Sequence, residues 1–223
     1  CDIFAIAPAN TLWALSIPLD SYTGYIEAYD GWLDKRMKLS DVRAHRSALS
    51  SATGVSPLEW VSSLRPSEVA AVSFVSGDKA LTVNVLHSSK LTDDSDVQKF
   101  AYGGYMEALF GGAFARVDES CSFATDGWLI TGSHEAVDEW ASGRAREYSL
   151  LSKLCDAGLK SSVPTSGNAV LYFSVDKELL CPESAFNSVA KAKLADRLKK
   201  CDIMPAFLNL SSEKKSGLAV GFS

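Results

Sequence analysis

The sequence predicts an α+β fold: an antiparallel or mixed sheet, built from hairpins and covered by helices on one face. Three observations lead to this prediction. Apolar and polar residues alternate in neighbouring segments, glycine-containing turns join these segments in pairs, and segments with a helical period separate the pairs. A parallel α/β fold needs single strands that alternate with helices, whereas this chain pairs its strands.

Composition narrows the class of protein. The chain has 223 residues, of which 47% are hydrophobic and 22% charged, and these values exclude a disordered chain, a collagen and a coiled coil. The net charge of −5 argues against a nucleic-acid partner. The sequence has no run of about 20 apolar residues, so it predicts no membrane-spanning helix.

The first third of the chain is predicted to be one strand followed by three helices. Residues 12–19 form the strand, and Asp20 or Ser21 caps the first helix. A second helix begins at Ser40 and ends at Gly54, and a capping box at 56–59 opens the third. The apolar face of the first helix contains Tyr22, Tyr25, Ile26, Tyr29, Leu33 and Met37, with Trp32 beside it, and that of the second contains Val42, Leu49 and Ala52.

The middle of the chain is predicted to contain two hairpins. Residues 68–75 and 80–87 form the first, and residues 114–124 pair with Trp128–Gly132 around Asp126-Gly127 in the second. Between them, 92–96 would cap a helix that ends at Gly111-Gly112. Its predicted buried stripe is Val97, Phe100, Ala101, Gly104, Tyr105, Ala108 and Leu109. Ser133 would cap a short helix, and 148–159 would form another.

The order strand, helix, hairpin returns near the C-terminal end. Residues 169–175 are a predicted strand, 182–200 a helix, and Ala206–Leu210 with 218–222 a hairpin. We therefore expect a structural repeat, with a first unit at 1–160 and the start of a second, shorter one at 161–223. One compact domain is the alternative.

The residues that carry chemistry form no complete catalytic or metal motif, so we predict no catalytic, metal-binding or cofactor-binding residue. His45 should face solvent, His87 ends a strand, and His134-Glu135 is half of a zinc-binding H-E-x-x-H helix with Asp138 in place of the second histidine. A nucleophile elbow and a P-loop are both lacking, while a serine–histidine–aspartate triad stays open. The acidic residues Asp93, Asp94 and Asp96 suit a helix N-terminus, with a loose calcium site as the alternative.

The cysteines give information on the cellular location of the protein. Cys1 suits the lipidated first residue of a mature bacterial lipoprotein, with a nucleophile activated by its own α-amine, or a boundary without meaning, as alternatives. As a nucleophile it would need a carboxylate near that amine, and Asp2 or Asp20 is the nearest in sequence. The other cysteines are expected to be buried free thiols, with disulfides as the alternative: Cys121, Cys155, Cys181 and Cys201.

Aromatic residues at helical spacing are expected in the core, and Trp32 is the one aromatic off the helical stripe that would suit a binding surface. Burial of all the tryptophans would leave a glycan- or peptide-binding function without support: Trp13, Trp32, Trp60, Trp128 and Trp140.

Residues 123–137 carry a strand-to-helix step, FATDGWLITGSHEAV, and 64–70 and 6–10 show shorter similar patterns. These segments resemble Bacteroidales-type envelope lipoproteins of unknown function with repeated α+β domains. The resemblance implies an exported, lipid-anchored and non-enzymatic protein, and it would transfer only Cys1, as the site of lipid attachment.

Together these observations predict a non-catalytic cell-envelope protein, in the periplasm or at the outer membrane, that binds or scaffolds an unknown protein or glycan. It would need no cofactor and would touch the membrane only through a lipid anchor. The alternatives are an N-terminal-nucleophile amidohydrolase that uses Cys1 and a glycan- or peptide-binding module.

Overall fold

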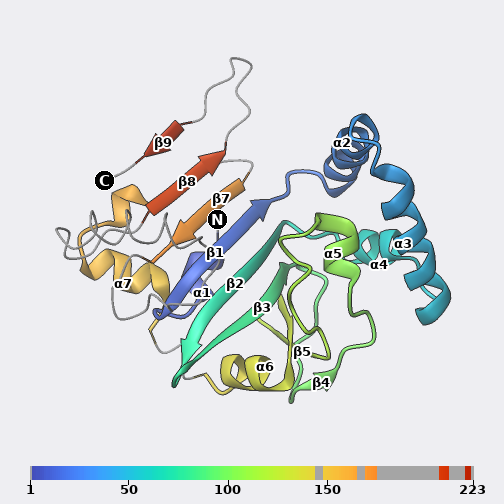
Figure 1. Ribbon diagram of the computed structural model, residues 1–223. Coiled ribbons are helices and arrows are strands. Elements are labelled where there is room, and N and C mark those ends of the chain that lie inside the picture. The colour runs from blue at the N-terminus through green and yellow to red at the C-terminus, as the bar shows by residue number, and fades with distance from the viewer. Residues whose placement is uncertain (1, 144–147, 165–168, 175–205, 211–218, 222–223) are drawn as a thin grey trace.

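The computed structural model describes residues 2–143, 148–164, 169–174, 206–210 and 219–221. Within these ranges nine strands form one sheet in the order β4-β5-β6-β3-β2-β1-β7-β8-β9 (Figure 1). Every neighbouring pair is antiparallel. The hairpin-built antiparallel sheet of an α+β fold is therefore confirmed.

The strands follow the predicted hairpins closely in the centre of the sheet. The bounds are β1 Thr11–Pro18, β2 Glu68–Ser76, β3 Lys79–His87, β4 Gln98–Lys99, β5 Cys121–Thr125, β6 Trp128–Gly132, β7 Ala169–Phe173, β8 Ala206–Leu210 and β9 Ala219–Gly221. Strand β1 lies between β2 and β7, so a strand from the start of the chain joins the hairpin β2–β3 to the C-terminal strands.

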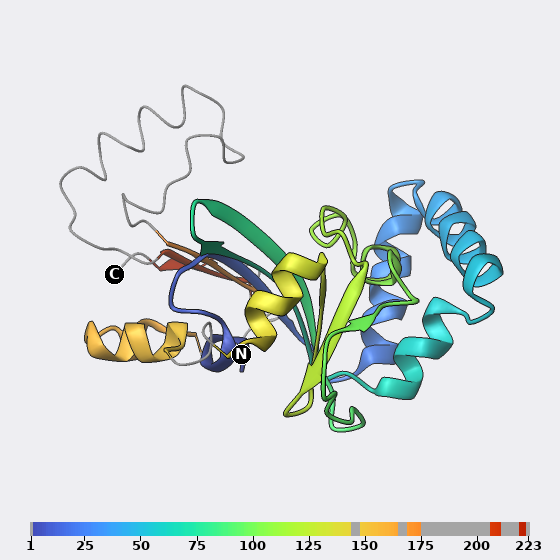
Figure 2. The ribbon, with the colours of Figure 1, turned by 90° about the horizontal axis from the view of Figure 1, so that it is seen from below.

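The helices lie in two groups. In chain order they are α1 Ile3–Ile6, α2 Tyr22–Lys35, α3 Leu39–Thr53, α4 Pro57–Leu64, α5 Tyr105–Phe110, α6 His134–Ala141 and α7 Leu150–Asp156, with a short 3-10 helix at Lys160–Ser162. Figure 2 shows α1, α6 and α7 apart from the group formed by α2, α3 and α4.

Helices cover both faces of the sheet, so the expectation of one covered face is wrong. Strand β2 is buried from Glu68 to Phe74 without a break, as in a strand enclosed from both sides. Its Val72 and Phe74 belong to a core cluster with residues of α1, α6 and α7. Its Val69 and Ala71 belong to a second cluster with residues of α4 and α5.

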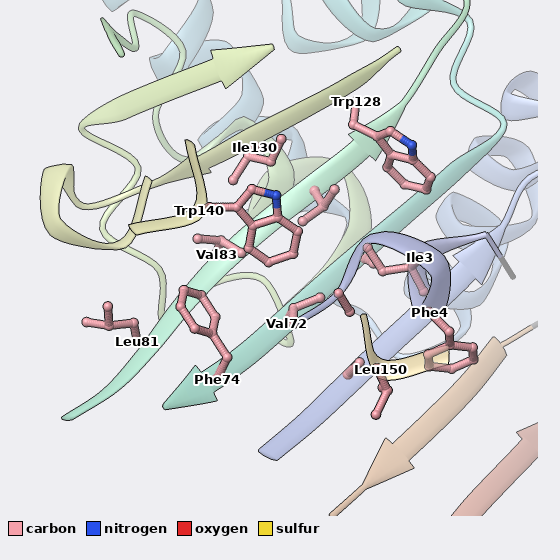
Figure 3. Close-up of a cluster of buried hydrophobic side chains, with 14 of the residues drawn as sticks. Ile3, Phe4, Val72, Phe74, Leu81, Val83, Trp128, Ile130, Trp140 and Leu150 are labelled. Atoms are coloured by element: carbon pink, nitrogen blue, oxygen red, sulfur yellow. The ribbon is translucent and has the colours of Figure 1, made fainter. Parts of the chain in front are cut away.

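Large aromatic and aliphatic side chains fill the first cluster (Figure 3). Trp140 of α6 is fully buried and meets Phe74 edge to face, with ring centroids 5.6 Å apart. Ile3 and Phe4 of α1 are also buried in this cluster. The N-terminal helix is therefore part of the core.

Local capping and turn signals form largely as predicted. The Ser21 and Ser133 side chains accept hydrogen bonds from Gly24 and Ala136 at the starts of α2 and α6. Asp126 and Gly127 have φ values of 50° and 78°, the positive values that a type I′ hairpin turn requires. The capping box at 56–59 is wrong in one respect: Pro57 begins α4, but the Ser56 side chain makes no capping bond.

The helix predicted over residues 97–109 is wrong for most of its length. Gln98 and Lys99 form β4 and pair with β5, and helix α5 begins only at Tyr105, after Gly104 with a φ of 84°. Strand pairing and a left-handed glycine therefore override the helical period. Tyr105, Ala108 and Leu109 from the predicted stripe are buried nevertheless.

Three further predictions need correction. The strand predicted at 114–124 is confined to Cys121–Thr125. The residues before it form a loop whose Phe114 and Glu119 are buried and contact Asn84 of β3. On α3, Ala52 is exposed and Val42 and Leu49 are only half-buried. On α2 only Leu33 is fully buried, and Met37 lies beyond the helix end and is exposed.

The structure does not show the predicted repeat. Strand β7 pairs with β1, and β8 pairs with β9 as the last predicted hairpin requires. The helix predicted at 182–200 lies outside the described residues, as does Cys1. None of the helices in the described ranges is both long and apolar enough to cross a bilayer.

Replacing a buried and an exposed tryptophan should lower the free energy of unfolding by different amounts. We expect Trp140→Ala to lower the free energy of unfolding by about 3–5 kcal/mol, because it leaves a large cavity. The matched variant Trp32→Ala removes the same side chain from a site that is 49% exposed, and should cost about 1 kcal/mol or less. Urea unfolding followed by circular dichroism measures both, and equal losses would contradict the assignment of the core.

Candidate binding surface on helix α2

A row of aromatic rings runs along helix α2 from the core to solvent. Tyr25 contacts the buried Phe110 of α5 at 5.5 Å between ring centroids, and it stacks on Tyr29 at 5.9 Å. Tyr29 stacks on Trp32, also at 5.9 Å, and the guanidinium of Arg36 lies 4.6 Å from the Trp32 ring centroid. We call Tyr25, Tyr29, Trp32 and Arg36 the α2 stack.

A buried arginine of α3 positions α2. Arg46 is only 6% exposed, and its Nη1 donates to both carboxylate oxygens of Asp30 on α2, at 2.9 and 3.1 Å. Its Nε donates to the carbonyl oxygen of Ala108 on α5, at 2.9 Å. One guanidinium therefore joins three helices. The neighbouring His45 is exposed, as predicted.

Glycine at the end of α5 makes room for the stack. Gly111, which ends α5 as predicted, has a φ of 92°, and a Cβ added there would lie 2.7 Å from the hydroxyl oxygen of Tyr29. A side chain at this position would therefore collide with Tyr29 as well as strain the backbone. The sequence suggests a helix terminator here, but the packing requirement is visible only in the structure.

The three tyrosines of helix α2 stay neutral at physiological pH. Burial raises the pKa of both Tyr22 and Tyr25 to about 12, and desolvation also raises the pKa of Tyr29. The positive charge of Arg46 opposes each of these shifts. The hydroxyl groups therefore remain protonated hydrogen-bond donors, and Arg36 is the charged member of the stack.

The arrangement of the rings decides which contacts the stack can make. Tyr29 stacks on both Tyr25 and Trp32, with interplanar angles of 17° and 16°, so its two neighbours partly cover its ring. Arg36 lies over the Trp32 ring, which also stacks on Tyr29. These contacts cover part of the stacked ring faces, while Trp32 as a whole is 49% exposed and Arg36 is exposed beside it.

A buried carboxylate, Glu119, holds the loop before β5 against the sheet. Its Oε1 accepts hydrogen bonds from Asn84 and Thr131, at 2.9 and 2.8 Å, and its Oε2 accepts one from the Gly104 amide at 2.8 Å. Desolvation raises the pKa of Glu119 and outweighs these bonds, which lower it. No motif identified this residue in the sequence.

His87 lies in a local polar contact at the end of β3. Its Nδ1 is 2.8 Å from the Ser67 hydroxyl oxygen, and its ring stacks on Trp128 at 4.3 Å. The Ser67 amide already donates to the carbonyl oxygen of His87. These contacts tie strand ends together, and we assign them a structural role.

The acidic residues considered for calcium bind backbone amides instead. Asp94 accepts the amide hydrogen of Ala124, Asp93 that of Asp126, and Asp96 that of Val97. They do not cap the predicted helix, since no helix begins there. Among the described residues no group of histidine, cysteine and acidic side chains could hold a metal ion. His134 is exposed, and Ser133 rather than His134 caps α6.

Glu68 fixes the N-terminal segment to the sheet. Its carboxylate accepts the amide hydrogens of Asp2 and Ile3, at 2.7 and 3.4 Å, and the hydroxyl hydrogen of Ser16 at 2.5 Å. Glu68 is therefore the carboxylate that binds the start of the described chain, while the α-amine of Cys1, for which the sequence suggested Asp2 or Asp20, lies outside the described residues. The Glu68 oxygens are occupied by the bonds that hold α1.

The cysteines and tryptophans can now be placed. Cys121 and Cys155 are free thiols, half-buried rather than fully buried, while Cys181 and Cys201 lie outside the described residues. Of the tryptophans, Trp60, Trp128 and Trp140 are buried and Trp13 is half-buried. Trp32, the tryptophan that the sequence suggested for a binding surface, is exposed, so a binding function is still possible at this position.

Comparisons with known proteins give no family for this chain. A scan of protein-family models found no match, and neither a search of curated proteins nor one of solved structures found a similar protein.

Removing the buried arginine should release α2. We expect Arg46→Ala to lower the free energy of unfolding by about 3 kcal/mol, because the change leaves the Asp30 carboxylate and the Ala108 carbonyl without their donor. The exposed Arg43 on the same helix supplies the control, and Arg43→Ala should cost about 0.5 kcal/mol or less. Denaturant unfolding measures both, and similar costs would contradict the positioning role.

Glu119 should make stability fall as the pH rises. Because the pKa of Glu119 is raised in the folded state, folding favours its protonated form, and this contribution to stability is lost as the pH rises from the ordinary carboxyl pKa of 4.5 through the higher folded pKa. We expect Glu119→Gln to flatten this part of the curve of unfolding free energy against pH. The control Glu27→Gln, at an exposed position of α2, should keep the slope of the parent chain. An unchanged slope in Glu119→Gln would contradict the assignment.

Proposed function

We propose that this protein is a non-catalytic binding or scaffolding protein of the bacterial cell envelope, and that the α2 stack is the surface with which it contacts a protein partner. One observation carries the binding role. A half-exposed tryptophan, Trp32, is connected through Tyr29 and Tyr25 to the buried Phe110, so the surface is continuous with a packed interior.

The composition of the stack suits a protein interface. Tryptophan, tyrosine and arginine are the residues that most often dominate binding energy at such interfaces. Stacking on Tyr29 and beneath Arg36 restricts the Trp32 ring before any partner arrives, so binding loses less side-chain entropy. The Trp32 ring is therefore preorganised for binding.

The ring arrangement favours a protein over a glycan as the partner. Sugars bind aromatic side chains mainly through open ring faces, whereas neighbours partly cover the faces of Tyr29 and Trp32. Ring edges and a guanidinium suit the carbonyl, carboxylate and apolar groups of a protein surface. The glycan-binding module remains the second candidate because of the exposure of Trp32.

The envelope address is part of the proposal and comes from the sequence. The resemblance to envelope lipoproteins supports it, and lipid attachment at Cys1 belongs to the same proposal. We do not propose the alternative of an amidohydrolase that uses Cys1, because no observation among the described residues favours it.

Crosslinking from the stack tests the binding role. A photoreactive phenylalanine analogue placed at Trp32 in cells that make the protein should give a discrete protein adduct. The same analogue at Tyr148, an aromatic site of similar exposure (45%), serves as the control and should not give that adduct. Binding of the identified partner should then weaken about tenfold or more in Tyr29→Ala. Identical adducts from both sites, or specific binding on a glycan array with none to protein, would refute a protein partner.

A further inference from the structure

The corner between α2 and α3 exposes apolar and basic side chains together. We define the α2–α3 corner as Trp32, Lys35, Arg36, Met37 and Lys38. Met37 is 87% exposed, the highest value among the large apolar side chains of the described residues, and Trp32 is 49% exposed. The three basic side chains are exposed as well. Figure 1 shows α2 and α3 at the edge of the molecule, away from the sheet.

The backbone holds Met37 outward. Helix α2 ends at Lys35, and the Met37 amide donates to the carbonyl oxygen of Asp34 while the Lys38 amide donates to that of Leu33. Met37 itself has a φ of 57°, a left-handed conformation that glycine adopts more easily. The corner is therefore a hydrogen-bonded turn, and its apolar side chain lies at the tip.

The charge at the corner opposes that of the whole chain. Lys35, Arg36 and Lys38 give three positive charges within four residues, opposed locally by Asp34 and by Asp41 in the first turn of α3. The whole chain has a net charge of −5. These five charged residues leave one net positive charge at the corner of an acidic protein, with the three basic side chains exposed, and this complements a negatively charged surface.

We propose that the α2–α3 corner contacts an anionic phospholipid bilayer. The Met37 and Trp32 side chains enter the interfacial region, where thioether and indole groups lose contact with water, and the basic side chains bind the lipid headgroups. A groove-bound peptide would need walls, and the exposure of Met37 shows that the described chain builds none around it. A protruding tip suits a bilayer.

This inference does not rest on the proposed protein partner, although the corner shares Trp32 and Arg36 with the α2 stack. The two contacts are distinguished by variants outside the shared residues: Tyr29→Ala should weaken only the partner contact, whereas the variants at Met37 and at Lys35 and Lys38 should weaken only the bilayer contact. The corner also differs from the sequence prediction, in which the membrane is touched only through a lipid on Cys1.

Vesicle binding by the full chain tests the proposal. Cys1→Ser is included in every sample so that no acyl chain can attach there. We expect the protein to sediment with vesicles of phosphatidylcholine mixed with phosphatidylglycerol, to ignore vesicles of phosphatidylcholine alone, and to be released as salt is added. Brominated lipid should quench tryptophan fluorescence, and Trp32→Phe should remove that quenching.

Matched variants identify the residues that contact lipid. Met37→Gly should weaken binding to the mixed vesicles severalfold while keeping the fold, because glycine accepts the positive φ, whereas Met37→Leu should bind like the parent chain. The double variant Lys35→Gln/Lys38→Gln should weaken binding roughly tenfold or more. Lys90→Gln/Lys99→Gln changes the net charge equally at exposed sites elsewhere and should leave binding unchanged.

Three results would overturn the proposal. They are failure of the parent chain to bind the mixed vesicles, equal binding by both lysine double variants, and binding to a polyglutamate peptide with none to vesicles. The last result would assign the corner to an acidic protein partner.

Discussion

Arg46 is the residue on which the position of the candidate binding surface depends. Helix α2 fully buries only Leu33, so apolar packing alone holds it weakly. The Arg46 guanidinium connects Asp30 of α2 to the Ala108 carbonyl of α5, and its planar, forked geometry specifies one orientation. Buried ion pairs add little net stability relative to apolar packing, and their value here is to fix where α2 lies.

The side chains that pack the core and those proposed to contact a partner lie in different parts of the molecule. The sheet buries two apolar clusters, one with Trp140 against Phe74 and one that includes Phe110 and Phe114. These clusters contain the large buried side chains, so α2 and α3 at the edge can leave aromatic and basic residues in solvent. Tyr25 is the link between the two regions, because it packs on Phe110 and begins the exposed stack.

The sequence predicts what local chemistry determines. Ser21, Ser133 and the Asp126-Gly127 turn carry their own structural signals, and all three behave as expected. Contacts between distant residues have no such signal: the pairing of β4 with β5 replaces a predicted helix, and Arg46 of α3 bonds to Asp30 of α2. The position of Trp32 beside the helical stripe indicates that it is exposed. The stacking of its neighbours could not be predicted from the sequence, because it depends on the space that Gly111 leaves for Tyr29.

The bonds of Glu68 have a mechanical consequence. Because its carboxylate holds the Asp2 and Ile3 amides and the Ser16 hydroxyl, tension applied ahead of Asp2 passes directly to β1 and β2 in the middle of the sheet. The many backbone bonds between these antiparallel strands would share that load. A pull on the N-terminal end would therefore act on two strands inside the sheet and not on an edge strand.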